Sequence, residues 1–454
     1  MTQRITIDRE DPRYWNYDDE RLLLLGATDT DSLFQWTGNG LEEHLDDLVS
    51  VGGNYVRNTM SDRQRDYDAD DKKSGSVYAF ESERPGRFDL ERWNEGYWQR
   101  LRDFLEETAS RDVFVELTLW DQHDFSDGLW EKSPWNPENN TTYSSAESGI
   151  DGRSDFFAAV ERDNDLVTAH QERFVRKILS ISLEYGHVLY NITNEGWAGL
   201  PWENHWCDII HEEARAHDVE VHVANMNMSP RISFDKSIID PERYSFVEIS
   251  QHNQDTMGKF GQEHWDDLMT WRLALHETGG LRPMNNVKIY GSEKPHVHAG
   301  DAEEAVDRMW RAILAGCASE RFHRPIGAGA GEWGIGLNDR ARSTIRSIRL
   351  LADEVDLTET IPRNDLLVNR TPNDSYCVTT PNEQYVVYLP KGGSAILDLY
   401  RLSDDRHSKW LNVETGDWEA GDGGTQTEVK RTGGGEPVEL EAPGDGSWIV
   451  VFSN

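Results

Sequence analysis

Two glutamates close apolar runs of the chain and are candidates for a catalytic pair of carboxyl groups. The run LYNITNEGW, over residues 189–197, passes from apolar residues to Asn194, Glu195 and Trp197. The run NVKIYGSE, over 286–293, ends at Glu293. If both runs are strands whose ends meet, one carboxylic acid can protonate the oxygen that leaves a glycosidic bond, while the opposed carboxylate attacks the anomeric carbon or activates water. Asn194 would then bind a sugar hydroxyl, and Trp197 would stack on a sugar ring.

These two runs belong to a series of eight. Short apolar runs alternate with amphipathic helical patterns over about three quarters of the chain, with apolar residues spaced three and four apart in the helices. The pattern predicts a (β/α)8 barrel over residues 1–358, with its active site at the carboxyl ends of the strands. An open doubly wound sheet is the alternative, but no GxGxxG follows the first strand to favour it. The expected strands are 21–28, 53–60, 113–120, 187–194, 219–226, 246–253, 286–293 and 318–323.

Other polar and aromatic residues at the strand ends are candidates for substrate binding. Each also has a structural interpretation: Asn194 and Glu195 could cap a helix, Glu293 could form an ion pair, and any one tryptophan could be a core or loop-anchoring residue. The position of the two glutamates at strands four and seven favours the catalytic interpretation for them. The further substrate-binding candidates are Arg57, Trp120, His123, His252, Tyr290 and Trp333.

Four histidines raise a metal site as an alternative. His123, His252, His296 and His298 follow expected strands, and HVH at 296–298 is similar to the HxH of metal-dependent amidohydrolases. That motif belongs on the first strand of such barrels, whereas the first strand here ends in GATDTD. We therefore expect no metal and no other cofactor. We assign the histidines to hydrogen bonding with sugar hydroxyls or, for His298, to a loop position.

The character of the chain changes near residue 359. From there to residue 454, alternating patterns such as YVVYLP and GSWIVVF are separated by Gly, Pro, Asn and Asp clusters. This region is predicted to be an all-β sandwich domain that packs on the barrel.

The composition limits the partners. The chain of 454 residues has a formal net charge of -37, which should repel nucleic acid and anionic membranes. Its 17 Trp, 15 Tyr and 14 Phe argue for a folded chain and against disorder. Arg outnumbers Lys about three to one, and the acidic residues are spread throughout, as in proteins of halophiles. No apolar run is long enough to span a membrane and the N-terminus shows no export signal, so we expect a cytoplasmic protein; the sequence does not indicate its oligomeric state.

Three segments resemble the family-5-like barrels of clan A glycoside hydrolases. NITNEGW at 191–197 is similar to the Asn-Glu motif on their fourth strand, KIYGSEKPH at 288–296 to the nucleophile position on the seventh, and YVRNTM at 55–60 to the second. The segment at 316–339, followed by a β domain, more specifically resembles apiosidase-like barrels whose C-terminal domain is named for collagen binding.

The resemblance implies a retaining enzyme that cleaves an oligo- or polysaccharide by double displacement. Glu293 would be the nucleophile, ionised and steadied by Arg57, and Glu195 a protonated acid that later acts as a base. The sequence departs from the pattern at strand six, which ends in QHN, so that Tyr290 or His252 would replace the usual tyrosine partner of the nucleophile. A carbohydrate-binding barrel without catalytic activity is the alternative from another functional class.

Overall fold

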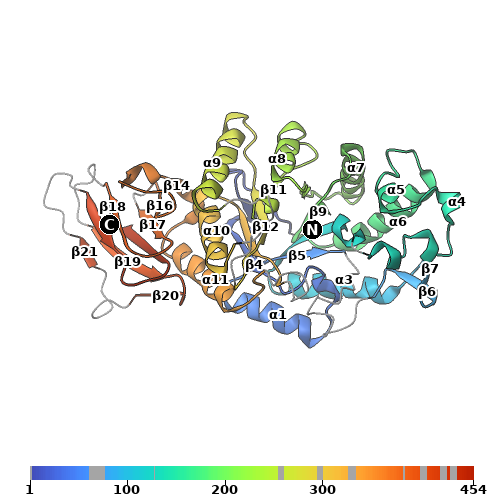
Figure 1. Cartoon of the computed structure of the whole chain (residues 1–454), viewed down its shortest axis with the longest axis horizontal. Coiled ribbons are helices and arrows are strands. Elements are labelled where there is room, and N and C mark those ends of the chain that lie inside the picture. Colours follow the sequence, from blue (N-terminus) through green and yellow to red (C-terminus); the bar gives the residue numbers. More distant parts are fainter. Residues whose placement is uncertain are drawn as a thin grey trace.

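The computed structural model describes two parts of an elongated molecule, a barrel and a C-terminal β domain at opposite ends of the long axis (Figure 1). The described residues are 3–60, 77–126, 128–253, 260–293, 300–325, 334–381, 384–398, 406–419, 427–429 and 437–453. Within these ranges, no helix is long and apolar enough to cross a membrane.

Eight parallel strands form the barrel, in the chain order expected from the sequence. They are hydrogen-bonded in the order β10-β9-β8-β5-β4-β13-β12-β11, and Ser245 N, which donates to Val223 O at 2.9 Å, links the two ends of this order. The (β/α)8 prediction is therefore confirmed, and the open doubly wound sheet is wrong. The strands are β4 (Leu24–Ala27), β5 (Tyr55–Thr59), β8 (Phe114–Asp121), β9 (Val188–Asn194), β10 (Val223–Ala224), β11 (Val247–Glu248), β12 (Met284–Ile289) and β13 (Ser319–Phe322).

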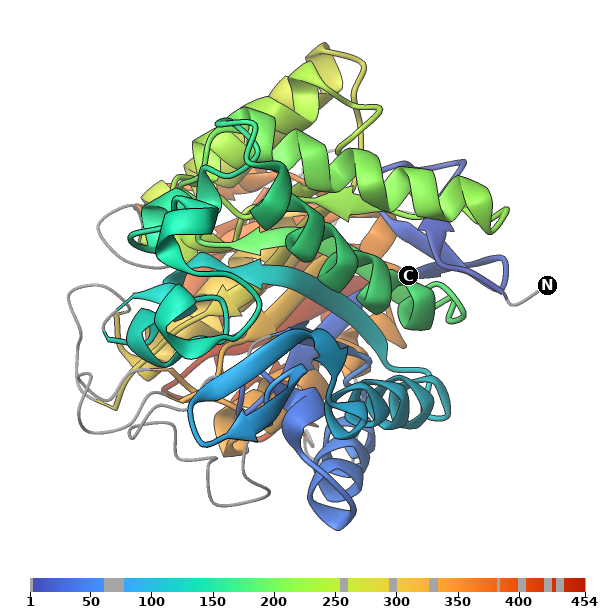
Figure 2. The same cartoon turned by 90° about the vertical axis from the view of Figure 1, so that its right-hand side faces the viewer.

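A helix follows each of the eight strands, and helices flank the sheet above and below when it is viewed from the side (Figure 2). Side-chain caps mark where several of them begin: Asn94, Asn164, Asp301 and Asn338 each accept a hydrogen bond from a backbone N–H of the first turn. The helices are α1 (Asn39–Ser50), α3 (Glu95–Ala109), α6 (Asp165–Ser182), α7 (Leu200–Ala216), α8 (Pro230–Ile239), α9 (Gly261–Glu277), α10 (Ala302–Ala315) and α11 (Asp339–Ala352).

Several smaller elements were not expected from the sequence. A hairpin of β6 (Phe80–Arg84) and β7 (Arg87–Trp93) precedes α3, and the short helices α4 (Ser145–Ser148) and α5 (Arg153–Phe157) lie between β8 and α6. The N-terminal strands β1 (Thr6–Ile7), β2 (Trp15–Tyr17) and β3 (Glu20–Leu22) form a small sheet. Its fully buried Trp15 donates through Nε1 to Asn285 Oδ1 of β12 at 3.0 Å, so this sheet is tied to the barrel strands.

The C-terminal domain consists of two antiparallel sheets. One contains β14 (Ile361–Pro362), β16 (Tyr376–Thr379), β17 (Tyr385–Leu389), β19 (Arg406–Asn412), β20 (Asp417–Trp418), β21 (Thr427–Val429) and β23 (Trp448–Ser453). The other contains β15 (Leu367–Val368), β18 (Ser394–Leu397) and β22 (Val438–Glu441). A small apolar core between them includes Val387, Leu397, Leu440 and Val450.

The larger sheet also packs directly on the barrel helices. Tyr388 of β17 stacks on Trp310 of α10 with ring centroids 5.6 Å apart, and its hydroxyl donates to Asp307. Tyr376 of β16 lies 4.8 Å from Trp265 of α9. One face of the sheet thus belongs to the main core of the molecule. The proposed division at residues 358 and 359 falls between α11 and β14 and stays a prediction.

The barrel interior buries three carboxyl groups beneath its mouth. Glu116 accepts hydrogen bonds from Tyr55 Oη at 2.6 Å and Asn191 Nδ2 at 3.0 Å. Burial raises the pKa of Glu248 well above its ordinary value, and the neighbouring Glu116 raises it further. Burial likewise raises the pKa of Glu320, with a contribution from Glu248. The interior therefore holds Glu248 and Glu320 in the neutral form over a wide pH range.

Replacing Glu248 with glutamine should stabilise the protein at alkaline pH. The pKa of Glu248 is higher in the folded state than the unfolded value of about 4.3, so the folded form binds the proton more tightly. The free energy of unfolding of the wild type therefore falls as pH rises from the unfolded pKa to the folded pKa, by up to about 1.4 kcal/mol per pH unit. The substituted amide has no proton to lose. Urea unfolding at pH 5 and pH 8 should show a gain that grows with pH, and the same change at exposed Glu43 should show none. Equal pH dependence in Glu248→Gln and wild type would contradict the prediction.

Candidate active site

Glu195 directly follows β9 at the carboxyl end of the fourth barrel strand. Its backbone has a φ of 50°, in the left-handed region that residues with side chains rarely adopt. Gly196 next to it admits no larger residue, since an added Cβ would lie 2.5 Å from Thr193 Cγ2. This sharp turn fixes the direction of the Glu195 side chain, and backbone strain of this kind is concentrated at functional sites.

The carboxylate of Glu195 is held by side chains from three other strand ends. Lys288 of β12 places Nζ 2.5 Å from Oε1, and Gln251, beyond β11, donates through Nε2 to the same oxygen at 3.3 Å. His123, beyond β8, has Nδ1 4.0 Å from Oε2. Strands three, four, six and seven therefore converge on one carboxylate.

The charge state of Glu195 differs from the one expected for a resting general acid. Burial alone would raise the pKa of Glu195, but Lys288, His123 and Arg57 outweigh it and lower the pKa to about 2. The expectation that Glu195 is kept protonated is therefore wrong for the ligand-free molecule, because Lys288 was not foreseen as its partner. Lys288 itself is 1% exposed, and burial lowers its pKa while Glu195 opposes that shift.

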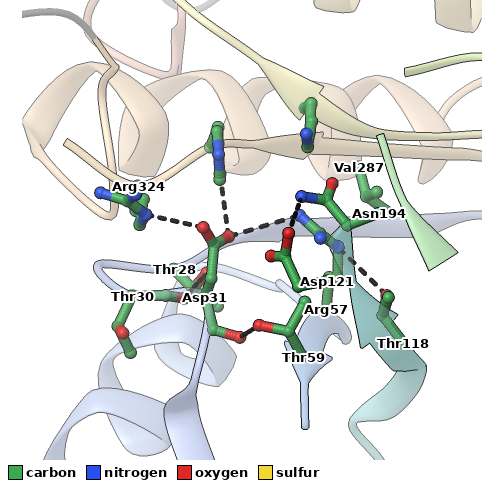
Figure 3. A network of polar contacts seen from close by, with 12 residues as sticks. Thr28, Thr30, Asp31, Arg57, Thr59, Thr118, Asp121, Asn194, Val287 and Arg324 are labelled. Carbon is green, nitrogen blue, oxygen red and sulfur yellow. Dashed lines mark hydrogen bonds and ion pairs between the residues drawn. The ribbon is translucent and has the colours of Figure 1, made fainter. Parts of the chain in front are cut away.

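Asp31, beyond β4, is the centre of a second network in the barrel mouth (Figure 3). Its Oδ1 accepts from Arg57 Nη1 of β5 at 3.3 Å, and its Oδ2 accepts from Arg324 Nε at 2.7 Å. His323 Nδ1, also beyond β13, lies 3.4 Å from Oδ1. Arg57 also donates through Nε to Thr118 Oγ1 at 3.3 Å. Strands one, two, three and eight are joined in this way.

Arg57 and Asn194 each present a buried polar atom to this region. Arg57 is fully buried, and its Nη2 makes no hydrogen bond within the described part of the chain. Asn194 donates through Nδ2 to Asp121 Oδ1 at 2.9 Å, whereas its buried Oδ1 has no hydrogen-bond partner among the same residues (Figure 3). A buried donor and a buried acceptor are thus available to a ligand, since leaving them unsatisfied is unfavourable.

Tyr290 lies between the two networks, one residue beyond β12. Its ring lies 4.4 Å from that of His323 in an edge-on contact, and it is 2% exposed. Burial raises the pKa of its hydroxyl well above the ordinary value, and the nearby Glu195 and Asp31 charges add to the shift. Tyr290 is therefore a neutral hydroxyl beside both carboxylates.

Three other predicted residues are placed as follows. Glu293 lies beyond the end of β12 and is exposed. Trp197 is 44% exposed, with its ring 5.4 Å from Phe157 and the Arg153 guanidinium 5.7 Å above it. Trp333 lies outside the described residues.

Trp120 and His252 occupy core positions instead of binding positions. Trp120 is 2% exposed and packs against Phe174 and Trp206 of the surrounding helices, with centroids 5.3 and 5.5 Å away. His252 is 1% exposed and stacks on His264 of α9 at 4.4 Å. Neither ring is open to a sugar, because each is enclosed by helices outside the strands.

The residues missed from the sequence are Lys288, Asp31, His323 and Arg324. Lys288 carried a usable signal: in the run NVKIYGSE it shares a face with Asn286 and Tyr290, so a lysine was due to point into the barrel. Asp31 and Arg324 lie in loops, where side-chain direction has no periodicity to reveal it.

The described residues provide no metal-binding cluster that would support the metal alternative. Among them, no group of three or more His, Cys, Asp or Glu could hold a metal ion. His296 and His298, which raised this alternative, lie outside the described residues.

Comparisons with known proteins identify structures of the same fold. No family model and no curated protein matches the sequence. The structure is similar to a glycoside hydrolase family 5 protein from Bacteroides vulgatus, with a TM-score of 0.66, 12% identity, and coverage of 99% of this chain and 92% of that one. It is also similar to a mutant family 5 mannosidase from Rhizomucor miehei, with a TM-score of 0.51, 14% identity, and coverage of 78% of this chain and 99% of that one. A third similar structure is a noncanonic maltogenic alpha-amylase from Thermotoga neapolitana, with a TM-score of 0.51, 11% identity, and coverage of 95% of this chain and 99% of that one. At these identities the likeness shows the fold.

Proposed function

We propose that this protein is a retaining glycoside hydrolase in which Glu195 and Glu293 are the two catalytic carboxyl groups. The observation that carries the proposal is the Glu195 carboxylate, fixed by a strained turn at the end of strand four and surrounded by side chains of three other strand ends. The mouth of a (β/α)8 barrel is where the active sites of such folds lie. The similar structures, two of them named as family 5 glycoside hydrolases, support the same activity.

The reaction proceeds in two displacements. Glu293 attacks the anomeric carbon, the bond from that carbon to the leaving oxygen breaks, and Glu195 gives its proton to that oxygen. Water then attacks the same carbon and loses a proton to Glu195, and the bond to Glu293 breaks. The sugar is released with its original anomeric configuration, and both carboxyl groups return to their starting states.

Lys288 controls when Glu195 can act as the acid. The Lys288 ammonium holds Glu195 ionised, although burial on its own favours the protonated form. A leaving-group oxygen that enters between Nζ and Oε1 separates the two charges, and burial then raises the pKa of Glu195 so that it takes up a proton. The carboxylate form needed for the second displacement is the one that Lys288 stabilises.

The two open polar atoms supply sugar contacts. Asn194 Oδ1 can accept a hydrogen bond from a sugar hydroxyl, and Arg57 Nη2 can donate to the Glu293 carboxylate or to a sugar oxygen. His123, 43% exposed beside Glu195, is placed to hydrogen-bond a further hydroxyl. These assignments imply a carbohydrate substrate and no cofactor. Whether that substrate is an oligo- or polysaccharide stays a prediction from the sequence.

Proton NMR of the first product tests the proposal. A panel of p-nitrophenyl α- and β-glycosides, including mannosides, is incubated with the protein in molar KCl, the salt that its acidic composition favours. We expect turnover of at least one glycoside, with the product formed first in the configuration of the substrate. Initial formation of the opposite anomer would show inversion and refute double displacement. Binding of a glycoside without turnover would identify a carbohydrate-binding barrel instead.

A further inference from the structure

Exposed apolar side chains occur in the segment that follows Glu195 and in the segment paired with it. Ten large apolar residues among those described are exposed on a chain whose net charge is -37. Five of the ten come from the segments that follow β9 and β10, and four of these lie within about ten residues of the strand ends. They are Trp197, Leu200, Met228 and Ile232, which are 44%, 49%, 43% and 44% exposed. We call these four residues the apolar rim.

The segments that carry the apolar rim are held together by backbone hydrogen bonds. Gly196 N donates to Met226 O at 2.8 Å, and Met228 N donates to Gly196 O at 3.2 Å. Gly196 and Asn227 form a parallel β-bridge. The rim residues Trp197 and Met228 therefore project from paired positions, each one residue beyond this bridge.

Both segments are also anchored on the barrel side. Gln122 Oε1 accepts from Trp197 N at 2.8 Å and from Ala198 N at 3.1 Å. Asn227 N donates to Ser233 Oγ of α8 at 2.8 Å. The apolar rim is thus a preformed surface, held open to solvent by the backbone on which it stands.

The position of the rim identifies what it contacts. This step of the inference rests on the proposed function, in which Glu195 donates a proton to the glycosidic oxygen. The surface next to Glu195 then contacts the leaving group on the far side of that oxygen. A sugar in that place needs hydrogen-bonding partners for its hydroxyls, whereas leucine, methionine and isoleucine side chains offer none. Exposed apolar patches on soluble proteins mark binding sites for apolar groups.

We infer that the apolar rim is a binding site for an apolar aglycone, so that the preferred substrates are glycosides of alkyl or aryl alcohols. The rim buries the hydrocarbon part of the leaving alcohol while the sugar lies in the barrel mouth. Trp197 supplies a flat face nearest to the bond that is cleaved, and Met228, with its flexible thioether, accommodates chains of different shape.

Calorimetric titration of the intact protein tests the inference independently of turnover. The two ligands are octyl β-glucoside, used below its micelle concentration, and methyl β-glucoside. We expect the octyl compound to bind roughly tenfold more tightly. The double variant Met228→Ser, Ile232→Ser should lose most of this difference, because both residues are exposed and their replacement leaves the core intact. Ile239→Ser, at an 81% exposed position on the same helix, should keep it.

The outcomes separate this inference from the proposed function. Octyl preference that is lost in the double variant supports the aglycone site even if no glycoside is hydrolysed. Equal affinity for both compounds, or an octyl preference unchanged in the double variant, overturns the aglycone site. A gluco-oligosaccharide that is cleaved with a higher kcat/KM than octyl β-glucoside also overturns the aglycone site, but it supports the proposed hydrolase activity. If the double variant alters the sedimentation coefficient instead of the octyl affinity, the inference is overturned and the rim is a contact between copies of the chain.

Discussion

Replacement of Glu195 by glutamine should lower kcat/KM by roughly 10³-fold for alkyl glycosides, the size of effect typical of general acid–base catalysis. The amide keeps the shape of the side chain but can neither donate the proton nor accept it later. A dinitrophenyl glycoside should suffer a much smaller loss in its first displacement, because dinitrophenolate leaves without protonation. Azide should then restore turnover and yield a glycosyl azide, since it attacks without a base. Stopped-flow release of dinitrophenol, with and without azide, measures both effects.

Glu293→Gln provides the matched comparison. The nucleophile is needed for every leaving group, so this variant should lose turnover with alkyl and dinitrophenyl glycosides alike. Any glycosyl azide that it forms should have the inverted configuration, because azide must then attack the substrate directly. Circular dichroism should show both variants folded, because Glu293 is exposed and the amide oxygen introduced by Glu195→Gln can still accept a hydrogen bond from Lys288. A glycosyl azide of retained configuration from Glu293→Gln and of inverted configuration from Glu195→Gln would exchange the two roles. Near wild-type turnover of either variant would refute the pair.

Replacing Lys288 by methionine should move the alkaline limb of the kcat/KM profile to higher pH by roughly one unit or more. The limbs of this profile follow the groups of the free enzyme. Without the ammonium, the burial of Glu195 is opposed only by more distant charges, so its pKa rises from about 2 and the carboxyl group stays protonated to higher pH. Carbon-13 NMR titration of labelled glutamate, with Glu195→Gln to identify the signal, measures the pKa directly.

A second lysine in an ion pair provides the control for stability. Lys236 of α8 is partly buried and forms an ion pair with the fully buried Glu203. Lys236→Met and Lys288→Met should each destabilise the fold, since removing one partner leaves a buried charge uncompensated, an effect of about 3–5 kcal/mol. Only Lys288→Met should move the pH profile. An unchanged profile in a folded Lys288→Met protein would show that Lys288 does not set the protonation of Glu195.

The barrel was predictable because its signal is repeated. Each of the eight apolar runs overlaps an observed strand, although β10 and β11 are only two residues long inside runs of eight. Helix α9 carries a weaker signal than most of the other helices because polar residues interrupt its apolar face, with buried His264, Trp265, Leu268 and Trp271 among exposed acids. The hairpin β6–β7 was missed because charged residues dominate its sequence, FESERPGRFDLERW, and its apolar alternation is limited to Phe88 and Leu90.

The candidate site was predictable only along single strands. Asn194 and Glu195 could be found because a polar pair closes a strand that is otherwise buried. Their partners come from other strands, and no local pattern relates position 195 to position 288 or position 31 to position 324. Trp120 illustrates the opposite error: a tryptophan at a strand end was assigned to sugar binding, while it packs outward against α6 and α7.

The C-terminal sheet packs on helices at one side of the candidate site. Helices α9 and α10, which flank the strand that carries Lys288, are clamped by Tyr376 and Tyr388 of the β domain (Figure 1). Helices α7 and α8, which carry part of the rim beside Glu195, lie on the side of the barrel away from that domain. Lys288 therefore lies in the half of the barrel that the β domain contacts, and Glu195 lies in the other half. We therefore expect any motion that separates Lys288 from Glu195 to occur in the half of the barrel that lies away from the β domain.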